Sequence, residues 1–169
     1  MNNKKHPFIF IFNVILFFVL ILIHYTDKTA INISGISPVT ILPLLTAFSM
    51  FHSPLASALT GLLAGIFMDS CTIGSYCFNA IILLCLGTAI SLSANNLFNK
   101  NILAAIVLSL ITCFIYHVGQ WLVFQTFGKA FNESLMYLLK YAAPSALFSA
   151  IFIVPFYYIY RHFDKVTSN

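Results

Sequence analysis

Charged residues are scarce in this sequence. Lys, Arg, Asp and Glu together make up 7% of the 169 residues, whereas 60% of the residues are hydrophobic. A water-soluble domain of this size needs a polar surface, and this composition does not supply one. No polar block is long enough to fold separately. The composition therefore excludes a soluble enzyme and predicts an all-α integral membrane protein that forms a single domain over residues 1–169.

Acidic residues are the scarcest group, with four acids against eight basic residues and a net charge of +4. The charges are scattered over the ends of the apolar segments instead of forming a basic patch. Charges in such positions indicate on which side of the membrane each loop lies, and they give no reason to expect a nucleic-acid partner.

Motifs for metal or covalent chemistry are also missing. The four cysteines include no Cys-x-x-Cys pair, and no two histidines lie at ligand spacing. We therefore expect no metal, no cofactor and no catalytic residue, since a single acid without a paired carboxylate or a nucleophile is not a catalytic constellation. A disulfide between Cys71 and Cys77 stays open as an alternative, although free thiols are favoured.

Long apolar runs are what the sequence does contain. They predict six transmembrane helices, at residues 8–25, 38–51, 55–68, 78–94, 102–127 and 135–160. The turn from His52 to Pro54 is expected to join the second helix to the third, because proline suits the first turn of a helix. The second and third helices are short, so a five-helix alternative stays open in which residues 39–68 form a re-entrant pair.

The basic residues predict the orientation of the chain. Six helices place both termini on the same side of the membrane. Five basic residues fall on that side, namely Lys4, Lys5, Lys100, Arg161 and Lys165. The other side holds Lys28 and Lys129, with Lys140 near the head of the sixth helix as a possible third. We therefore expect both termini to be cytoplasmic. The apolar run after Lys5 is too long for a signal peptide and lacks a small-residue cleavage site, so we expect it to be retained.

Small residues recur at every fourth position in two of the predicted helices. Ser57, Gly61 and Gly65 are followed at the same spacing by Asp69, and residues four apart lie along one helix face. A second stripe is formed by Ala142, Ala146 and Ala150. Such stripes allow another helix to approach closely in a membrane. The sequence leaves open whether that helix belongs to this chain or to a partner.

A few polar residues lie within or beside the apolar segments. Asp69 is the only acid among them, and a structural role as a cap that accepts backbone hydrogen bonds is favoured over a catalytic one. Asn79 is expected to satisfy backbone groups where the fourth helix begins. His117 and Gln120 are interpreted as hydrogen-bond partners between helices.

The order of these features resembles the MreD family of rod shape-determining membrane proteins. The resemblance is carried by the segment GLLAGIFMD from Gly61 to Asp69, by Gly74 five residues later, and by the pair Asn79-Ala80. The pattern is G-x-x-x-G-x-x-x-D, a loop glycine and then N-A. Chain length, the short polar N-terminus and the six-helix hydropathy profile also fit.

The resemblance implies a non-enzymatic scaffold in the bacterial plasma membrane. Members of this family bind the single-helix protein MreC and help to couple MreB filaments to peptidoglycan synthases, namely penicillin-binding proteins and RodA-type enzymes. Their fold is similar to that of the substrate-binding subunits of energy-coupling-factor transporters. A vitamin or small-molecule importer subunit is therefore the alternative, with Asp69, Asn79, His117 or Gln120 as ligand groups. The first predicted helix lacks the alanine stripe typical of such subunits, which favours the scaffold.

Overall fold

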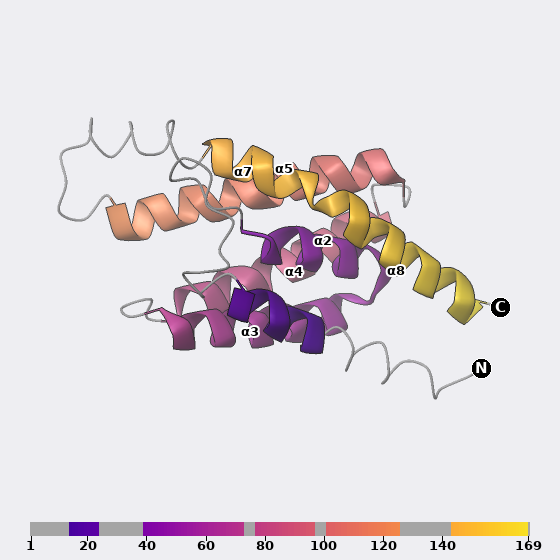
Figure 1. Ribbon diagram of the computed structural model, residues 1–169, viewed down its shortest axis with the longest axis horizontal. Coiled ribbons are helices and arrows are strands. Elements are labelled where there is room, and N and C mark those ends of the chain that lie inside the picture. Colours follow the sequence, from indigo (N-terminus) through magenta and orange to yellow (C-terminus); the bar gives the residue numbers. More distant parts are fainter. Residues whose placement is uncertain (1–13, 24–38, 73–76, 97–100, 126–142, 169) are drawn as a thin grey trace.

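The computed structural model describes residues 14–23, 39–72, 77–96, 101–125 and 143–168, and the elements in these ranges are all helical. Figure 1 shows their arrangement. They are a helix at Val14–Ile23, α2 (Ile41–Phe51), α3 (Pro54–Cys71), α4 (Phe78–Asn96), α5 (Ile102–Gln120) with a π-helical turn at Trp121–Gln125, α7 (Ala143–Ile151) and α8 (Ile153–Ser168). The prediction of an all-α protein is confirmed for this part of the chain.

Three of the described helices are long and apolar enough to cross a membrane. They span Pro54–Cys71, Phe78–Asn95 and Ile102–Val123. Eighteen residues of helix extend about 27 Å, close to the ~30 Å of a hydrocarbon core. The helices at Val14–Ile23 and Ile41–Phe51 are apolar but shorter. These lengths indicate a membrane protein.

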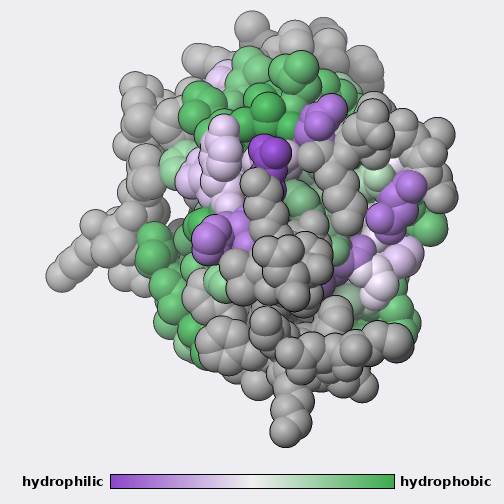
Figure 2. Space-filling view, turned by 90° about the vertical axis from the view of Figure 1, so that its right-hand side faces the viewer, coloured by the Kyte–Doolittle hydropathy of each residue, from purple (hydrophilic) through white to green (hydrophobic). Residues whose placement is uncertain are grey.

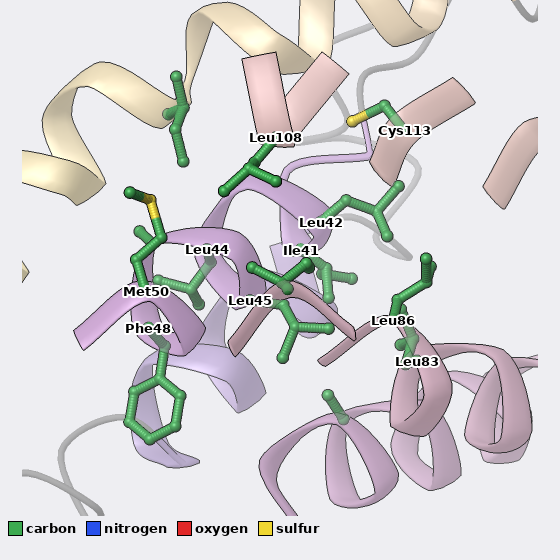
Figure 3. Close-up of a cluster of buried hydrophobic side chains, with 14 of the residues drawn as sticks. Ile41, Leu42, Leu44, Leu45, Phe48, Met50, Leu83, Leu86, Leu108 and Cys113 are labelled. Carbon is green, nitrogen blue, oxygen red and sulfur yellow. The ribbon is translucent and has the colours of Figure 1, made fainter. Parts of the chain in front are cut away.

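The short helix α2 lies at the centre of the bundle. Every residue from Ile41 to Met50 is buried, because α3, α4, α5, α7 and α8 all contact this helix. Figure 3 shows its side chains pointing in several directions, toward Leu83 and Leu86 of α4 and toward Leu108 of α5. A helix that is apolar on all sides is expected to be enclosed in this way. Pro43 lies in the first turn, where its missing N–H costs little.

The predicted helix at 135–160 differs from the structure. In its described part it is divided at Phe152 into α7 and α8, and α8 continues to Ser168. Pro155 explains the division, since proline has no N–H to donate to the carbonyl of Ile151 four residues earlier, and its ring clashes with that carbonyl. At the division itself, the Phe152 N–H donates to the carbonyl oxygen of Ser149, three residues earlier, at 3.1 Å. The sequence contained this signal, and the prediction of one continuous helix was wrong.

Other boundaries shift by a few residues. Helix α3 continues to Cys71, so that Asp69 lies in its last turn instead of after its end. Pro54 occupies the first position of α3, and the preceding Ser53 Oγ accepts a hydrogen bond from the Ala56 N–H at 3.4 Å. Of the predicted first helix, only residues 14–23 belong to the described part.

Hydrophilic residues gather at one end of the molecule. The turn between α2 and α3, the C-terminal end of α4, the start of α5 and the C-terminal half of α8 meet there (Figure 1). Figure 2 views this end and shows hydrophilic residues on the face with strongly apolar ones toward its edges. The described exposed residues at this end include Ser53, Asn95, Asn101, Arg161 and His162. This distribution is what a membrane surface requires at the ends of spanning helices.

The enclosure of α2 predicts a contrast between two Leu→Ala substitutions. Leu44 is 0% exposed and Leu103 is 73% exposed. Leu44→Ala leaves a cavity and is expected to cost roughly 2 kcal/mol of stability, the low end of the range for buried leucines. The measurement is the thermal unfolding of the purified protein in mild detergent, followed by circular dichroism.

Leu103→Ala serves as the control for this prediction, since it removes the same atoms from a surface that faces lipid or detergent. Its unfolding midpoint is expected to stay close to that of the unchanged protein. Equal effects of the two substitutions would contradict the enclosed position of α2.

Candidate functional site

The backbones of α3 and α4 lie in direct contact along the predicted small-residue stripe. A Cβ atom added at Gly61 would overlap the carbonyl oxygen of Leu83, and one added at Gly65 would overlap the backbone of Ala80. Gly87 on α4 repeats the arrangement, because a Cβ atom there would lie 2.6 Å from the Ser57 carbonyl oxygen. The stripe therefore packs against a helix of the same chain.

Asp69, at the end of the stripe, caps the N-terminus of α4. Its Oδ1 accepts hydrogen bonds from the Asn79 backbone N–H at 3.3 Å and from Asn79 Nδ2 at 2.9 Å. Its Oδ2 accepts from the Ala80 N–H at 2.9 Å. The first N–H groups of a helix have no partner within the helix, and they carry partial positive charge. The carboxylate of Asp69 supplies the missing hydrogen-bond acceptors and places negative charge beside these partially positive N–H groups.

A chain of hydrogen bonds continues from this cap to α5. The Tyr116 hydroxyl donates to Asn79 Oδ1 at 2.7 Å, and Gln120 Nε2 donates to the Tyr116 oxygen at 3.0 Å. Asn79 and Tyr116 are buried. Gln120, Tyr116, Asn79 and Asp69 thus form a chain of hydrogen bonds that links three helices, and Asp69 and Gln120 at its two ends are half-buried. Buried polar atoms such as those of Asn79 and Tyr116 are costly to leave without partners.

A second polar chain joins α5 to α7 and to Val39, two residues before α2. His117 Nδ1 lies 2.8 Å from the Cys113 carbonyl oxygen, and Nε2 lies 3.3 Å from Ser145 Oγ. Ser149 Oγ donates to the Ser145 carbonyl oxygen at 2.7 Å and accepts from the Val39 N–H at 2.8 Å. His117 therefore lies at the contact of α5 with α7, whereas Gln120 bonds to Tyr116 within α5.

The structure brings together only some of the residues singled out from the sequence. Ser57, Gly61, Gly65, Asp69 and Asn79 all lie at the α3–α4 contact. Gly74 and Ala142 are outside the described residues. Ala146 and Ala150 belong to α7, but their side chains are outside the described part, so the packing of the alanine stripe stays a prediction. Ser57 Oγ is buried and has no hydrogen-bond partner among the described atoms.

Sequence reasoning missed the α4 side of the contact and the role of Tyr116. Ala80, Leu83 and Gly87 are spaced by three and four residues and face the stripe on α3. That spacing was visible in the sequence, whereas nothing in the sequence pairs Tyr116 with Asn79. Among the described non-glycine residues, Cys77, just before α4, has a positive φ, at 61°.

The glycine contact, the Asp69 cap and the hydrogen bonds described above are suited to hold α3, α4 and α5 together. The carboxylate of Asp69 is engaged with the start of α4, and the part of the chain that the structure describes contains no group of three His, Cys, Asp or Glu residues able to hold a metal ion. Each contact is modest, about 1 kcal/mol for a helix cap and about 0.6 kcal/mol for a hydrogen bond between membrane helices. Together with the close backbone contact they define one relative position of α3, α4 and α5.

The backbone contact predicts opposite effects for two Gly→Ala substitutions. In Gly65→Ala the new methyl group meets the Ala80 backbone, which cannot move aside without separating the helices. We expect a loss of roughly 1–3 kcal/mol in thermal unfolding, more than the ~1 kcal/mol that alanine gains in helix propensity.

Gly119→Ala is the matched control. Its methyl group would approach the side-chain ends of Ile82 and Phe78, at 2.8 and 3.4 Å, and these ends can shift. We expect this variant to be as stable as the parent or slightly more so. If Gly65→Ala is tolerated equally well, α3 and α4 are not in backbone contact.

The cap predicts that Asp69→Asn destabilises the protein. Asparagine keeps the shape but presents an NH₂ group to one of the backbone N–H donors and removes the charge at the helix N-terminus. The expected cost is about 1–2 kcal/mol, read from thermal unfolding. Ser70→Ala is the control, since the exposed Ser70 hydroxyl bonds only within α3, to the Ile66 carbonyl oxygen at 2.8 Å. A larger effect of Ser70→Ala than of Asp69→Asn would contradict the cap.

Comparison with known proteins does not assign the chain to a family. No protein-family model matches it, no curated protein is detectably similar in sequence, and no solved structure is detectably similar in fold. The resemblance to the MreD family therefore depends on the motif between Gly61 and Ala80, and the function that it implies is a proposal.

Proposed function

We propose that this protein is a non-enzymatic scaffold of the MreD kind in the cell-elongation machinery of the bacterial plasma membrane. Its partner would be an MreC-like single-helix protein, and through it the protein would help to couple MreB filaments to penicillin-binding proteins and RodA-type synthases. The observation that carries the proposal is that the residues of the family-like motif act together. Gly61 and Gly65 admit the α4 backbone, and Asp69 binds Asn79 and Ala80.

The described motif residues all take part in one helix contact. Gly61 and Gly65 admit the backbone of α4, and Asp69 accepts hydrogen bonds from the first N–H groups of that helix. A motif of this kind serves a protein whose task is to present fixed helix surfaces. The proposed architecture has six transmembrane helices with both termini in the cytoplasm, in the fold of energy-coupling-factor substrate-binding subunits.

The partner helix has to bind outside the glycine stripe. Because α4 covers Gly61 and Gly65, a second protein cannot reach that face of α3 while the fold persists. The faces that stay open on α3 carry large apolar side chains, among them Leu55, Leu59 and Leu63. Substitutions in the stripe would therefore disturb partner binding through the position of α3 relative to α4.

The importer alternative would use the polar groups as ligand contacts. Asp69, Asn79 and Gln120 make hydrogen bonds to one another or through Tyr116, and His117 bonds to Cys113 and lies near Ser145. A ligand would have to replace these bonds at the cost of desolvated partners. This consideration favours the scaffold.

The test is a pull-down of the tagged full chain from its native membrane in a gentle detergent, with mass spectrometry of the retained proteins. A tagged, unrelated multi-pass protein of the same membrane is the control for nonspecific retention. We expect enrichment of a single-helix MreC-like protein together with penicillin-binding or RodA-type synthases. Recovery of an ATP-binding cassette pair with its coupling subunit instead would overturn the scaffold in favour of the importer.

A variant comparison separates partner binding from folding. Gly119→Ala, which is expected to fold normally, should retain the same partners, whereas Gly65→Ala should lose both thermal stability and partner recovery. Full partner recovery by an unfolded Gly65→Ala protein would show that retention is nonspecific.

A further inference from the structure

An outward-facing stripe runs along α7 and α8 and changes in chemistry along its length. Leu147, Ile151 and Val154 are 62%, 65% and 36% exposed, and Tyr158 follows at 55%. Arg161 comes next and is exposed, beside the exposed His162. The spacing of four, three, four and three residues is that of one helix face. The stripe therefore passes from aliphatic side chains to a phenol and then to a cation.

The adjacent, buried face of α8 fixes the direction in which this stripe points. Ile153, Tyr157 and Tyr160 are buried against the bundle. The Tyr157 ring lies 5.7 Å from that of Phe51, and the Tyr160 ring lies 5.7 Å from that of Phe48 on α2. Because these aromatic contacts hold α8 on α2, the exposed stripe cannot turn inward.

Arg161 has a defined position at the end of the stripe. Its guanidinium carbon lies 5.8 Å from the centre of the Tyr157 ring, within the range of a cation–π contact. This contact leaves the planar array of N–H donors available on an exposed residue. A guanidinium matches the geometry of a phosphate through paired hydrogen bonds.

We propose that the stripe binds an anionic phospholipid of the surrounding bilayer. The acyl chains lie along Leu147, Ile151 and Val154, the Tyr158 ring lies at the level of the glycerol backbone, and Arg161 binds the phosphate. Tyrosine is typical of this interfacial level in membrane proteins. An acidic peptide would satisfy Arg161 but not the adjoining aliphatic surface, which is why the lipid is the favoured occupant. This inference does not depend on the proposed function.

The test compares two lipids with the same acyl chains. The full chain, purified in mild detergent, is titrated with dioleoylphosphatidylglycerol or dioleoylphosphatidylcholine, and bound lipid is quantified by native mass spectrometry. We expect about fivefold preference for the anionic lipid, the effect of one basic residue near an anionic surface. Arg161→Gln should abolish the preference, and Arg161→Lys should keep part of it, since the charge persists but the paired hydrogen bonds of the guanidinium are lost.

Lys129→Gln is the charge-matched control, because it removes the same charge at a position predicted to lie on the other side of the membrane. It should keep the preference, and circular dichroism verifies that all variants fold. Equal binding of the two lipids by the parent protein would overturn the proposal. So would an unchanged preference in Arg161→Gln, an equal loss in Lys129→Gln, or binding of a glutamate-rich peptide without any preference for phosphatidylglycerol.

Discussion

The contact between the backbones of α3 and α4 is the constraint on which the other packing depends. Lipid gives apolar helices no hydrophobic reason to associate, so close approach and satisfied polar groups have to supply the attraction. Gly61, Gly65 and Gly87 remove the side chains that would separate the two helices. Asp69 then fixes their lengthwise register, because its carboxylate reaches only the first N–H groups of α4.

The remaining helices are arranged around this pair. Helix α2 fills the space between the pair and α5, and its side chains make the apolar core that Figure 3 shows. The hydrogen bond from Tyr116 to Asn79 ties α5 to the same point at which Asp69 caps α4. The second polar chain, through His117, Ser145 and Ser149, connects α5 with α7, so two separate groups of hydrogen bonds align the helices.

The use of these polar groups in contacts between helices bears on the function of the protein. The polar groups that an importer would use to recognise a ligand are engaged in holding helices. The described side chains that α3, α4 and α5 expose are largely apolar, among them Leu55, Ile81 and Leu103. A protein built in this way offers helix faces to lipids and to other membrane helices. The proposed scaffold function uses such a face for a protein partner, and the proposed lipid site uses the exposed face of α7 and α8.

Composition and residue spacing by themselves determined that the chain is helical and apolar, that Pro54 begins a helix and that small residues stack with Asp69 on one face. These properties depend on local geometry and on hydropathy, which a sequence displays directly. Only the tertiary structure decided that the stripe packs on α4 of the same chain, that Asp69 caps a helix beginning nine residues later, and that Tyr116 completes the network. Those outcomes depend on which helices become neighbours, and the choice among apolar helices of similar length is made by the fit of whole surfaces, which residue spacing does not encode.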